Sequence, residues 1–147
     1  MTTQPRRTPL FEEHVALGGR LIDFSGWELP VQYSGIVDEH RQVRSSAGLF
    51  DLSHMGEVWV AGPGAGDALA HALVSDPRTL AVGRAQYSLL CAPDGGVIDD
   101  LIVYRTASER FLVVPNASNA ATVAAGLADR ARGFDATVDD ASGRTAL

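Results

Sequence analysis

The stretch that decides the fold, residues 86–106, reads QYSLLCAPDGGVIDDLIVYRT. Its two flanks, residues 86–91 and 97–106, are rich in apolar, β-branched and aromatic residues, which favours strands. Residues 93–96, PDGG, all favour turns and predict a four-residue hairpin connection between the flanks. We therefore expect an antiparallel hairpin in the middle of the chain.

Shorter strands and helices surround this hairpin. Apolar runs between turn-forming residues predict strands at 20–24, 57–61, 111–114 and 134–138. Periodic apolar residues predict helices at 9–17, capped by Thr8, at 35–47, capped by Ser34, at 63–73, and from Asn116 or Ser118 to about Arg132. Residues 26–30 are expected to be irregular.

The order of these elements predicts the fold class. Strands are joined mostly by turns, helices are interspersed, and no regular alternation of strand and helix is present. This pattern favours an α+β fold with a mixed, mainly antiparallel sheet and flanking helices. In the expected helix 35–47, Ile36, Val37, His40 and Val43 lie on one stripe.

Composition and charge exclude several classes of function. The chain has 147 residues, with 12 Lys and Arg against 18 Asp and Glu, and a net charge of −6. An acidic chain with no basic run is a poor partner for nucleic acid or an anionic membrane. No apolar run reaches the ~20 residues needed to span a bilayer, and no secretory signal follows Met1. The single cysteine, Cys91, favours a reducing compartment, so we expect a cytoplasmic protein.

Several familiar site patterns are missing from the sequence. Residues 62–66, GPGAG, have neither the spacing nor the lysine of a phosphate-binding loop and predict a turn into a helix. No two of the four histidines have the spacing of a zinc-binding pair, and Cys91 has no second cysteine beside it, so we expect no metal site. A nucleophile elbow of the G-x-S-x-G type is absent as well.

The adjacent aspartates Asp99 and Asp100 are the best candidates for chemistry. Neighbours on a strand point to opposite faces, and both faces of residues 97–104 are otherwise apolar, so we expect a strand covered on both sides and at least one poorly solvated carboxylate. With a four-residue turn, Leu89 lies opposite Asp100 and Tyr87 lies diagonal to it. Two interpretations stay open: a buried, tuned acid or base, or one solvent-facing aspartate with the other capping a backbone group.

A polar interruption, Ser53-His54-Met55, separates two strand-like segments and predicts a loop that presents side chains to a cleft. On its own, His54 is more typical of a structural hydrogen-bonding residue than of a catalyst. Met55 is equally typical of a residue that fills space in a core.

Four motifs occur in an order that is typical of one family. They are Thr8-Pro9-Leu10, Asp23-Phe24-Ser25-Gly26-Trp27 with Pro30-Val31-Gln32-Tyr33, Phe50-Asp51-Leu52-Ser53-His54-Met55, and Gly95-Gly96-Val97-Ile98-Asp99-Asp100-Leu101-Ile102-Val103. Across nearly its whole length the sequence resembles the N-terminal part of the aminomethyltransferases, or T-proteins, of the glycine cleavage system. The resemblance implies that residues 1–147 form the first part of a three-domain, folate-binding fold, with an internal boundary near residue 50.

The resemblance also implies a reaction and a set of site residues. The family moves a one-carbon unit from the aminomethyl-lipoyl arm of the H-protein to tetrahydrofolate and releases ammonia. Its key carboxylate corresponds to Asp100, which would hydrogen-bond the N10 side of the folate. Family folate contacts correspond to Met55, Tyr87, Val114 and Asn116, of which Asn116 would offer a donor and an acceptor. The resemblance assigns no catalytic step to the histidine of the third motif.

Two other functions stay open at this stage. One is a folate-dependent demethylase of an N-methyl amine on the same scaffold, and the other is a non-catalytic module that depends on a partner. Family members are more than twice as long, and the apolar ending Thr145-Ala146-Leu147 is typical of a cut through an element. A chain this short would then hold one wall of the folate site, so we expect weak folate binding and self-association through an exposed apolar edge.

Overall fold

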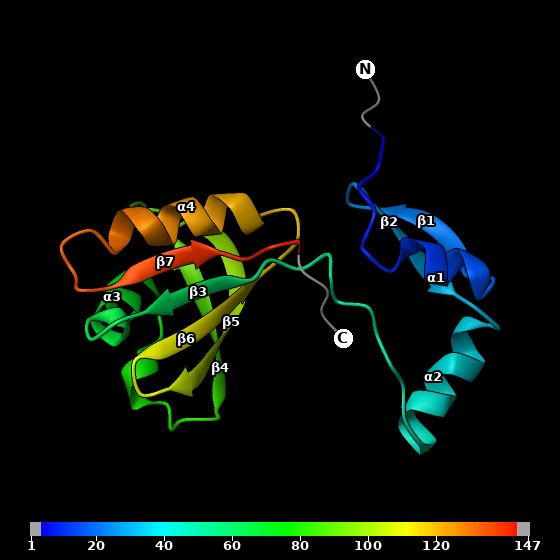
Figure 1. Cartoon of the computed structure of the whole chain (residues 1–147), viewed down its shortest axis with the longest axis horizontal. Coiled ribbons are helices and arrows are strands. Elements are labelled where there is room, and N and C mark those ends of the chain that lie inside the picture. Colours follow the sequence, from blue (N-terminus) through cyan, green and yellow to red (C-terminus); the bar gives the residue numbers. More distant parts are fainter. Residues whose placement is uncertain (1–3, 144–147) are drawn as a thin grey trace. The chain divides into compact units, whose positions relative to one another are not determined.

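The structure is a computed structural model that describes residues 4–143. By its internal contacts the chain divides into two compact units, which are both visible in Figure 1. Unit 1 runs to His54 and also takes in Gly143, whereas unit 2 comprises Met55–Ser142. The apolar ending of the sequence, residues 145–147, lies outside the described residues.

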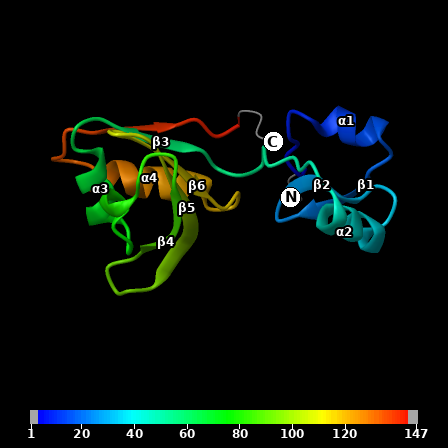
Figure 2. The same ribbon diagram turned by 90° about the horizontal axis from the view of Figure 1, so that it is seen from below.

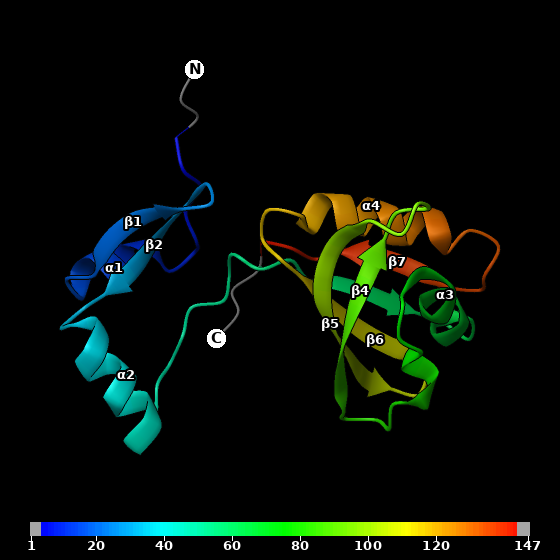
Figure 3. The same ribbon diagram turned by 180° about the vertical axis from the view of Figure 1, so that it is seen from behind.

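Unit 2 is built on a five-stranded sheet with the order β4-β5-β6-β3-β7 (Figure 3). Its strands are all paired antiparallel, and their bounds are β3 Val58–Ala61, β4 Ala85–Cys91, β5 Val97–Ala107, β6 Arg110–Pro115 and β7 Thr137–Asp140. The helices are α3 Ala65–Ala72, the short 3₁₀ turn η1 Pro77–Thr79 and α4 Ala120–Arg130.

The β4–β5 hairpin confirms the expected pairing of Leu89 with Asp100, although five residues, 92–96, separate the strands and the register shifts between Leu90 and Cys91. The Gly95 N–H donates to the Ala92 carbonyl at 2.9 Å, and Gly95 has a φ of +89°, which a residue with a side chain rarely adopts. In the ladder Leu89 pairs with Asp100 and Tyr87 with Ile102. Tyr87 and Asp100 are therefore diagonal neighbours on one face of the sheet.

One face of this sheet holds the hydrophobic core. Alternate strand residues point to it, and α3 and α4 pack on it; the core includes Val58, Val60, Leu69, Leu90, Leu101, Val103, Phe111, Val113, Val123 and Leu127. Figure 2 shows the strands curving past the two helices. No described helix packs on the other face of β5, whose outward residues Ile102 and Tyr104 are exposed. Within unit 2, β5 is therefore covered on one face, whereas the sequence predicted that both faces are covered.

Unit 1 contains α1 Phe11–Ala16, the antiparallel hairpin of β1 Arg20–Phe24 and β2 Trp27–Gln32, and α2 Ile36–Ser45. The expectation of irregular structure at 26–30 is wrong, because Trp27–Gln32 pairs with β1 despite Pro30. Proline lacks an N–H and is tolerated where a strand lies at the edge of a sheet. Outside the named strands, Arg6 forms an isolated parallel bridge with Trp27.

Both helix starts in unit 1 differ from the sequence prediction. The α1 helix begins at Phe11 rather than Pro9, and the Thr8 carbonyl, not its side chain, accepts the Phe11 N–H at 3.1 Å. The N-cap of α2 is Gly35 rather than Ser34. The Glu39 carboxylate instead accepts the N–H groups of residues 33, 34 and 35 at 2.7–2.9 Å, which lowers its pKa.

The expected stripe on α2 is present, but it is not buried. Ile36, Val37 and Val43 are exposed, and none of the residues of α2 is buried. The last strand also differs, since β7 begins at Thr137 rather than Phe134. The Phe134 N–H donates to the Ala131 carbonyl at 3.0 Å, in the turn that follows α4.

The architecture confirms the α+β class with a mainly antiparallel sheet and flanking helices. Within residues 4–143, none of the helices is both long and apolar enough to cross a membrane.

Candidate functional site

The face of the unit 2 sheet opposite the core is the candidate site, and we call it the open face. It carries the strand residues that alternate with the core residues, including Trp59, Tyr87, Leu89, Asp100, Ile102, Tyr104, Leu112 and Val114. Tyr87 is 62% exposed and Ile102 is 37% exposed. Around Asp100 the open face is therefore accessible and largely apolar and aromatic, and toward β7 it also carries Arg110 and Asp139.

The two adjacent aspartates have opposite environments. Asp99 shares the core side of β5 with Leu101 and Val103 and is only 3% exposed, whereas Asp100 lies on the open face and is exposed. The poorly solvated carboxylate that the sequence predicts in this pair is thus Asp99, and Asp100 is not half-buried. The core beneath the sheet takes the odd-numbered residues of β5, so the buried charge is Asp99.

Asp99 accepts hydrogen bonds from three N–H donors. Its Oδ2 takes the backbone N–H of Asn116 at 2.9 Å, and its Oδ1 takes the side-chain amides of Asn116 at 3.1 Å and Asn119 at 2.7 Å. A carboxylate out of water costs several kcal/mol unless donors replace its hydration, and these three donors do so. The interpretation in which one aspartate caps a backbone group thus describes Asp99.

Asp100 is held from two sides on the open face. The Tyr87 hydroxyl donates to Asp100 Oδ2 at 2.5 Å, and the Asn116 amide donates to Asp100 Oδ1 at 3.0 Å. The Tyr87 hydrogen bond lowers the pKa of Asp100, and the Asn116 bond adds to this effect. The same interaction with Asp100 raises the pKa of Tyr87. At neutral pH the pair is therefore a carboxylate anion held by a protonated phenol.

The amide group of Asn116 is already engaged as a donor. Its Nδ2 lies 2.9 Å from the Asp100 carbonyl in addition to the two aspartate side chains. An amide has two N–H groups, and three acceptors share them here. The side-chain oxygen Oδ1 accepts no hydrogen bond from residues 4–143, so Asn116 keeps an acceptor for a ligand, whereas its expected donor is occupied.

The other two expected contacts lie at the same end of the sheet. Val114 pairs with Ile102 across β5 and β6 and is partly buried on the open face. Met55 is the first residue of unit 2, and the N–H of its neighbour Gly56 donates to the Pro115 carbonyl at 3.1 Å. The structure thus brings Tyr87, Asp100, Val114 and Asn116 together and places the Met55 backbone next to the end of β6.

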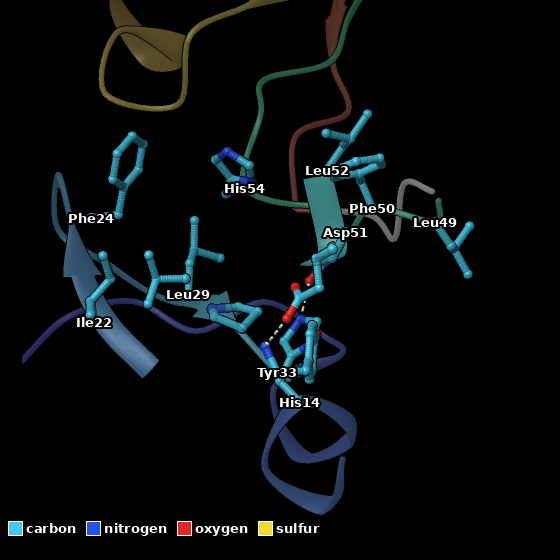
Figure 4. A pocket seen from close by; sticks show the side chains of 13 residues that line it. His14, Ile22, Phe24, Leu29, Tyr33, Leu49, Phe50, Asp51, Leu52 and His54 are labelled. Atoms are coloured by element: carbon cyan, nitrogen blue, oxygen red, sulfur yellow. Dashed lines mark hydrogen bonds and ion pairs between the residues drawn. The ribbon is translucent and has the colours of Figure 1, made fainter. Parts of the chain in front are cut away.

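A second polar cluster, which sequence reasoning missed, lies inside unit 1 (Figure 4). His14 Nε2 lies 2.8 Å from Asp51 Oδ2, and His14 Nδ1 lies 2.7 Å from the Tyr33 hydroxyl. The side chains of His14 and Asp51 are only 7% and 4% exposed. The three residues line a cavity of about 430 Å³ whose other walls include Ile22, Phe24, Leu29, Leu49 and Phe50.

The charges in this cluster are set by Asp51. Burial opposes its ionisation, but hydrogen bonds from Ser53 and His14 help to outweigh burial and lower the pKa of Asp51 to about 2. Burial, together with the charges of Asp51 and Glu39, raises the pKa of Tyr33. The cluster joins α1, the end of β2 and the segment after α2, so its first effect is to hold unit 1 together.

His54 lines the same cavity without such support. Burial lowers its pKa, with the charge of Asp51 opposing the change. Its buried Nδ1 has no hydrogen-bond partner among residues 4–143, and its ring meets Trp27 edge-on at 6.4 Å between centroids. The expectation of a structural hydrogen bond at His54 is thus not met at this nitrogen.

Within the described part of the chain, no three His, Cys, Asp or Glu side chains gather in a way that could hold a metal ion. The open face offers hydrogen-bonding groups, among them Tyr87, Asp100 and Asn116, on an apolar surface. Such a surface can bind a flat, apolar ring through its face and hold polar atoms at the ring edge.

Comparisons with known proteins identify the family. The family model described as "GCVT N-terminal domain" matches residues 10–147. The sequence is 50% identical over 145 residues to an aminomethyltransferase of Saccharopolyspora erythraea, covering 99% of this chain and 40% of that protein. It is 54% identical over 136 residues to an aminomethyltransferase of Streptomyces avermitilis, covering 92% of this chain and 37% of that protein.

A solved structure has the same fold. The crystal structure of glycine cleavage system aminomethyltransferase T from Bartonella henselae matches with a TM-score of 0.88 at 40% identity. The match covers 93% of this chain and 38% of that one, so the chain spans about two fifths of the length of the relatives it matches. On the family model and these relatives together, the chain belongs to the GCVT N-terminal domain family.

Proposed function

We propose that this chain provides the N-terminal, pterin-contacting part of a tetrahydrofolate-dependent aminomethyltransferase of glycine cleavage. The enzyme would move a one-carbon unit from the aminomethyl-lipoyl arm of the H-protein to tetrahydrofolate, with release of ammonia. The observation that carries the proposal is the meeting of Tyr87, Asp100 and Asn116 on one accessible face, in a chain that belongs to this family.

The groups on the open face fit a reduced pterin. Ile102 and Val114 offer an apolar surface on which a ring can lie, and Tyr87 adds an aromatic one. Asp100 and the free Oδ1 of Asn116 are acceptors, and the edge of a reduced pterin is rich in N–H donors. Met55, next to the end of β6, would add a flexible apolar contact.

In this proposal Asp100 is the catalytic residue. Because its pKa is lowered, it is an anion that accepts a hydrogen bond. A hydrogen bond between an anion and a nitrogen that gains positive charge is stronger than a neutral one, and stronger again where water is excluded. Asp100 is exposed in this chain, so water exclusion would have to come from the bound ligand and from groups outside the described residues.

The donor and the place of action are further parts of the proposal. The matched crystal structure is of a glycine cleavage system aminomethyltransferase, which supports lipoylated H-protein as the partner. We place the protein in the cytoplasm, a reducing compartment, because its single cysteine, Cys91, has no second cysteine in the sequence to pair with.

The first experiment is an NMR titration of the ¹⁵N-labelled chain with tetrahydrofolate up to millimolar concentration. We expect weak, saturable binding, with shifts concentrated at Tyr87, Ile102, Val114 and Asn116. Asp100→Asn should weaken binding about tenfold, since a charge-assisted hydrogen bond is lost. The matched control is Asp129→Asn, which removes an exposed charge on α4; binding unchanged by Asp100→Asn would contradict the proposed role.

A second experiment tests the reaction. The chain, combined with the remaining portion of an actinobacterial relative, is supplied with aminomethyl-lipoyl H-protein and tetrahydrofolate, and ammonia is measured. We expect ammonia release that depends on tetrahydrofolate and falls in Asp100→Asn. Turnover of N-methylglycine instead of the H-protein conjugate would favour a demethylase.

A further inference from the structure

We propose that Asp99 is a positioning residue: from the core side of β5 it fixes the amide of Asn116 so that Asn116 Oδ1 faces the ligand as an acceptor. This inference rests on the proposed function, because it concerns how the same open face recognises a reduced pterin. It assigns to the first aspartate of the pair a role that is separate from the contact made by Asp100.

The location of Asp99 rules out a direct contact with a ligand on the open face. Its side chain is on the opposite side of β5, among Leu101 and Val103, and is 3% exposed. All three of its described donors belong to the segment after β6: the backbone and side-chain N–H groups of Asn116 and the side chain of Asn119. Asp99 can therefore act on the site only through this segment.

The hydrogen bonds of Asn116 set which way its amide points. Three acceptors, Asp99 Oδ1, the Asp100 carbonyl and Asp100 Oδ1, lie 2.9–3.1 Å from Nδ2. If the amide turned over, its oxygen would face three oxygens and lose every donor contact. The observed orientation, with Nδ2 inward and Oδ1 free, follows from this arrangement of acceptors.

Asp99 matters most once a ligand engages Asp100. A ligand N–H that displaces the Asn116 amide from Asp100 Oδ1 removes one of the three contacts that hold the amide. Asp99 takes no part in that displacement, and it also holds the Asn116 backbone N–H at 2.9 Å. It keeps Asn116 Oδ1 directed outward while Asp100 changes partner.

Asn119 completes the support. It is the N-cap residue of α4, yet its side chain donates to Asp99 at 2.7 Å and makes no capping hydrogen bond to its own helix. The amide thus anchors the Asp99 carboxylate against the start of α4, which packs on the core side of the sheet. Asn119→Ala loosens this anchor while leaving the charge of Asp99 and all open-face groups in place.

The decisive experiment is a double-variant cycle read by the NMR titration with tetrahydrofolate. Asp99→Asn is nearly isosteric but replaces one of the two accepting oxygens by a donor. Either the backbone N–H or the side-chain amide of Asn116 then loses its acceptor, so we expect about tenfold weaker binding. In an Asn116→Ala background the same change should weaken binding no further, because the group through which it acts is gone. Equal losses in both backgrounds would overturn the proposal, as would wild-type affinity in Asp99→Asn.

Two further arms keep the test decisive. If Asp99→Asn does not fold, Asn119→Ala takes its place, with an expected loss of about threefold that also disappears in Asn116→Ala; no loss would overturn the proposal. Asp129→Asn, an exposed α4 charge paired with Arg132, should bind like wild type. A loss shared by this control would reflect charge in general and would also count against Asp99.

The ligand-free protein provides a readout that does not depend on folate binding. The side-chain amide signals of Asn116 should be well dispersed in the wild type and shift in Asp99→Asn. If tetrahydrofolate fails to bind any variant, the proposed function fails, while a shift of these signals still supports the positioning role. Unchanged Asn116 signals would overturn the positioning role even if tetrahydrofolate binds.

Discussion

The two units of this chain solve the problem of burying apolar surface very differently. Unit 2 buries alternate residues of five strands against two helices and leaves one face open. In unit 1 the buried hydrophobic residues are Phe11 and Trp27, and most of the exposed large hydrophobic side chains of the described chain belong to this unit, including Phe50, Leu49 and Ile36. The open face of unit 2 can hold its side chains rigidly because a well-packed hydrophobic core lies beneath it.

Unit 1 depends more on polar contacts for its order. Its sheet is a single hairpin, and a two-stranded sheet alone is marginally stable in water. The buried pair of His14 and Asp51, with Tyr33, joins its separate segments. Hydrophobic packing therefore dominates one unit and a hydrogen-bonded cluster the other, and each can be perturbed selectively.

The largest expected effect comes from the core of unit 2. Phe111 is 1% exposed and Phe50 in unit 1 is 58% exposed, so the same truncation tests both. Phe111→Ala should cost about 3–5 kcal/mol of the free energy of unfolding, and Phe50→Ala should change it by no more than about 0.5 kcal/mol. Trp59 reports on unit 2 and Trp27 on unit 1, so urea unfolding of single-tryptophan variants separates the units.

If Phe50→Ala costs as much as Phe111→Ala, Phe50 is buried in solution and the contrast between the units is wrong. If Phe111→Ala affects the Trp27 transition as strongly as that of Trp59, the two units unfold together. Either result would show that units 1 and 2 do not differ in stability as their packing predicts.

The second effect is the response of unit 1 to acid. The pKa of Asp51 is about 2 in the folded chain, below the ordinary aspartate value of about 3.9. A pKa that is lower in the folded than in the unfolded chain stabilises the fold at any pH above the unfolded-state pKa. This stabilisation, about 2 kcal/mol, is lost as the pH falls from about 4 to 2. We expect the urea midpoint of the unfolding transition reported by Trp27 to fall over this pH range.

Asp51→Asn is the control for this acid response. The variant should be less stable at neutral pH and should lose most of the change between pH 4 and 2. If the Trp27 transition of the wild type does not depend on pH in this range, the pKa of Asp51 is not lowered by its neighbours.

Local sequence predicted the hairpin and the pairing of Leu89 with Asp100, but not the register shift between Leu90 and Cys91 beside the turn. It could not predict which aspartate is buried. The faces of β5 read as equally apolar, and the packing of α3 and α4, which are distant in sequence, decides between Asp99 and Asp100. An observable signal was the pair of asparagines, Asn116 and Asn119, just after a strand, since two amides there suggest a buried acceptor nearby.

The cluster in unit 1 escaped prediction for a related reason. His14 and Asp51 are 37 residues apart, and no local sequence pattern links them. Helix starts were misplaced because carbonyl and glutamate partners replaced the expected Thr8 and Ser34 caps. Pairings between distant segments depend on tertiary structure, which periodicity does not encode.

A smaller effect concerns association through unit 1. Exposed apolar side chains such as Leu49, Phe50 and Ile36 favour contact between copies. We expect the mass from light scattering to rise with concentration and this rise to weaken in Phe50→Ser. A monomer at high concentration would contradict the expectation of self-association, and an undiminished rise in Phe50→Ser would locate the contact elsewhere.

The smallest expected effect is confined to the open face of unit 2. Tyr87→Phe removes the hydroxyl that donates to Asp100 at 2.5 Å, and this bond is the main reason why the pKa of Asp100 is lowered. The pKa should therefore rise toward the ordinary aspartate value, which a ¹³C NMR titration of the carboxyl group measures directly. Both side chains are exposed, so urea unfolding at neutral pH should hardly change. Because the Asn116 bond remains, the rise in the pKa of Asp100 should be incomplete in Tyr87→Phe and should increase when Asn116→Ala is added. If neither substitution changes the pKa of Asp100, its carboxylate is hydrogen-bonded only to water.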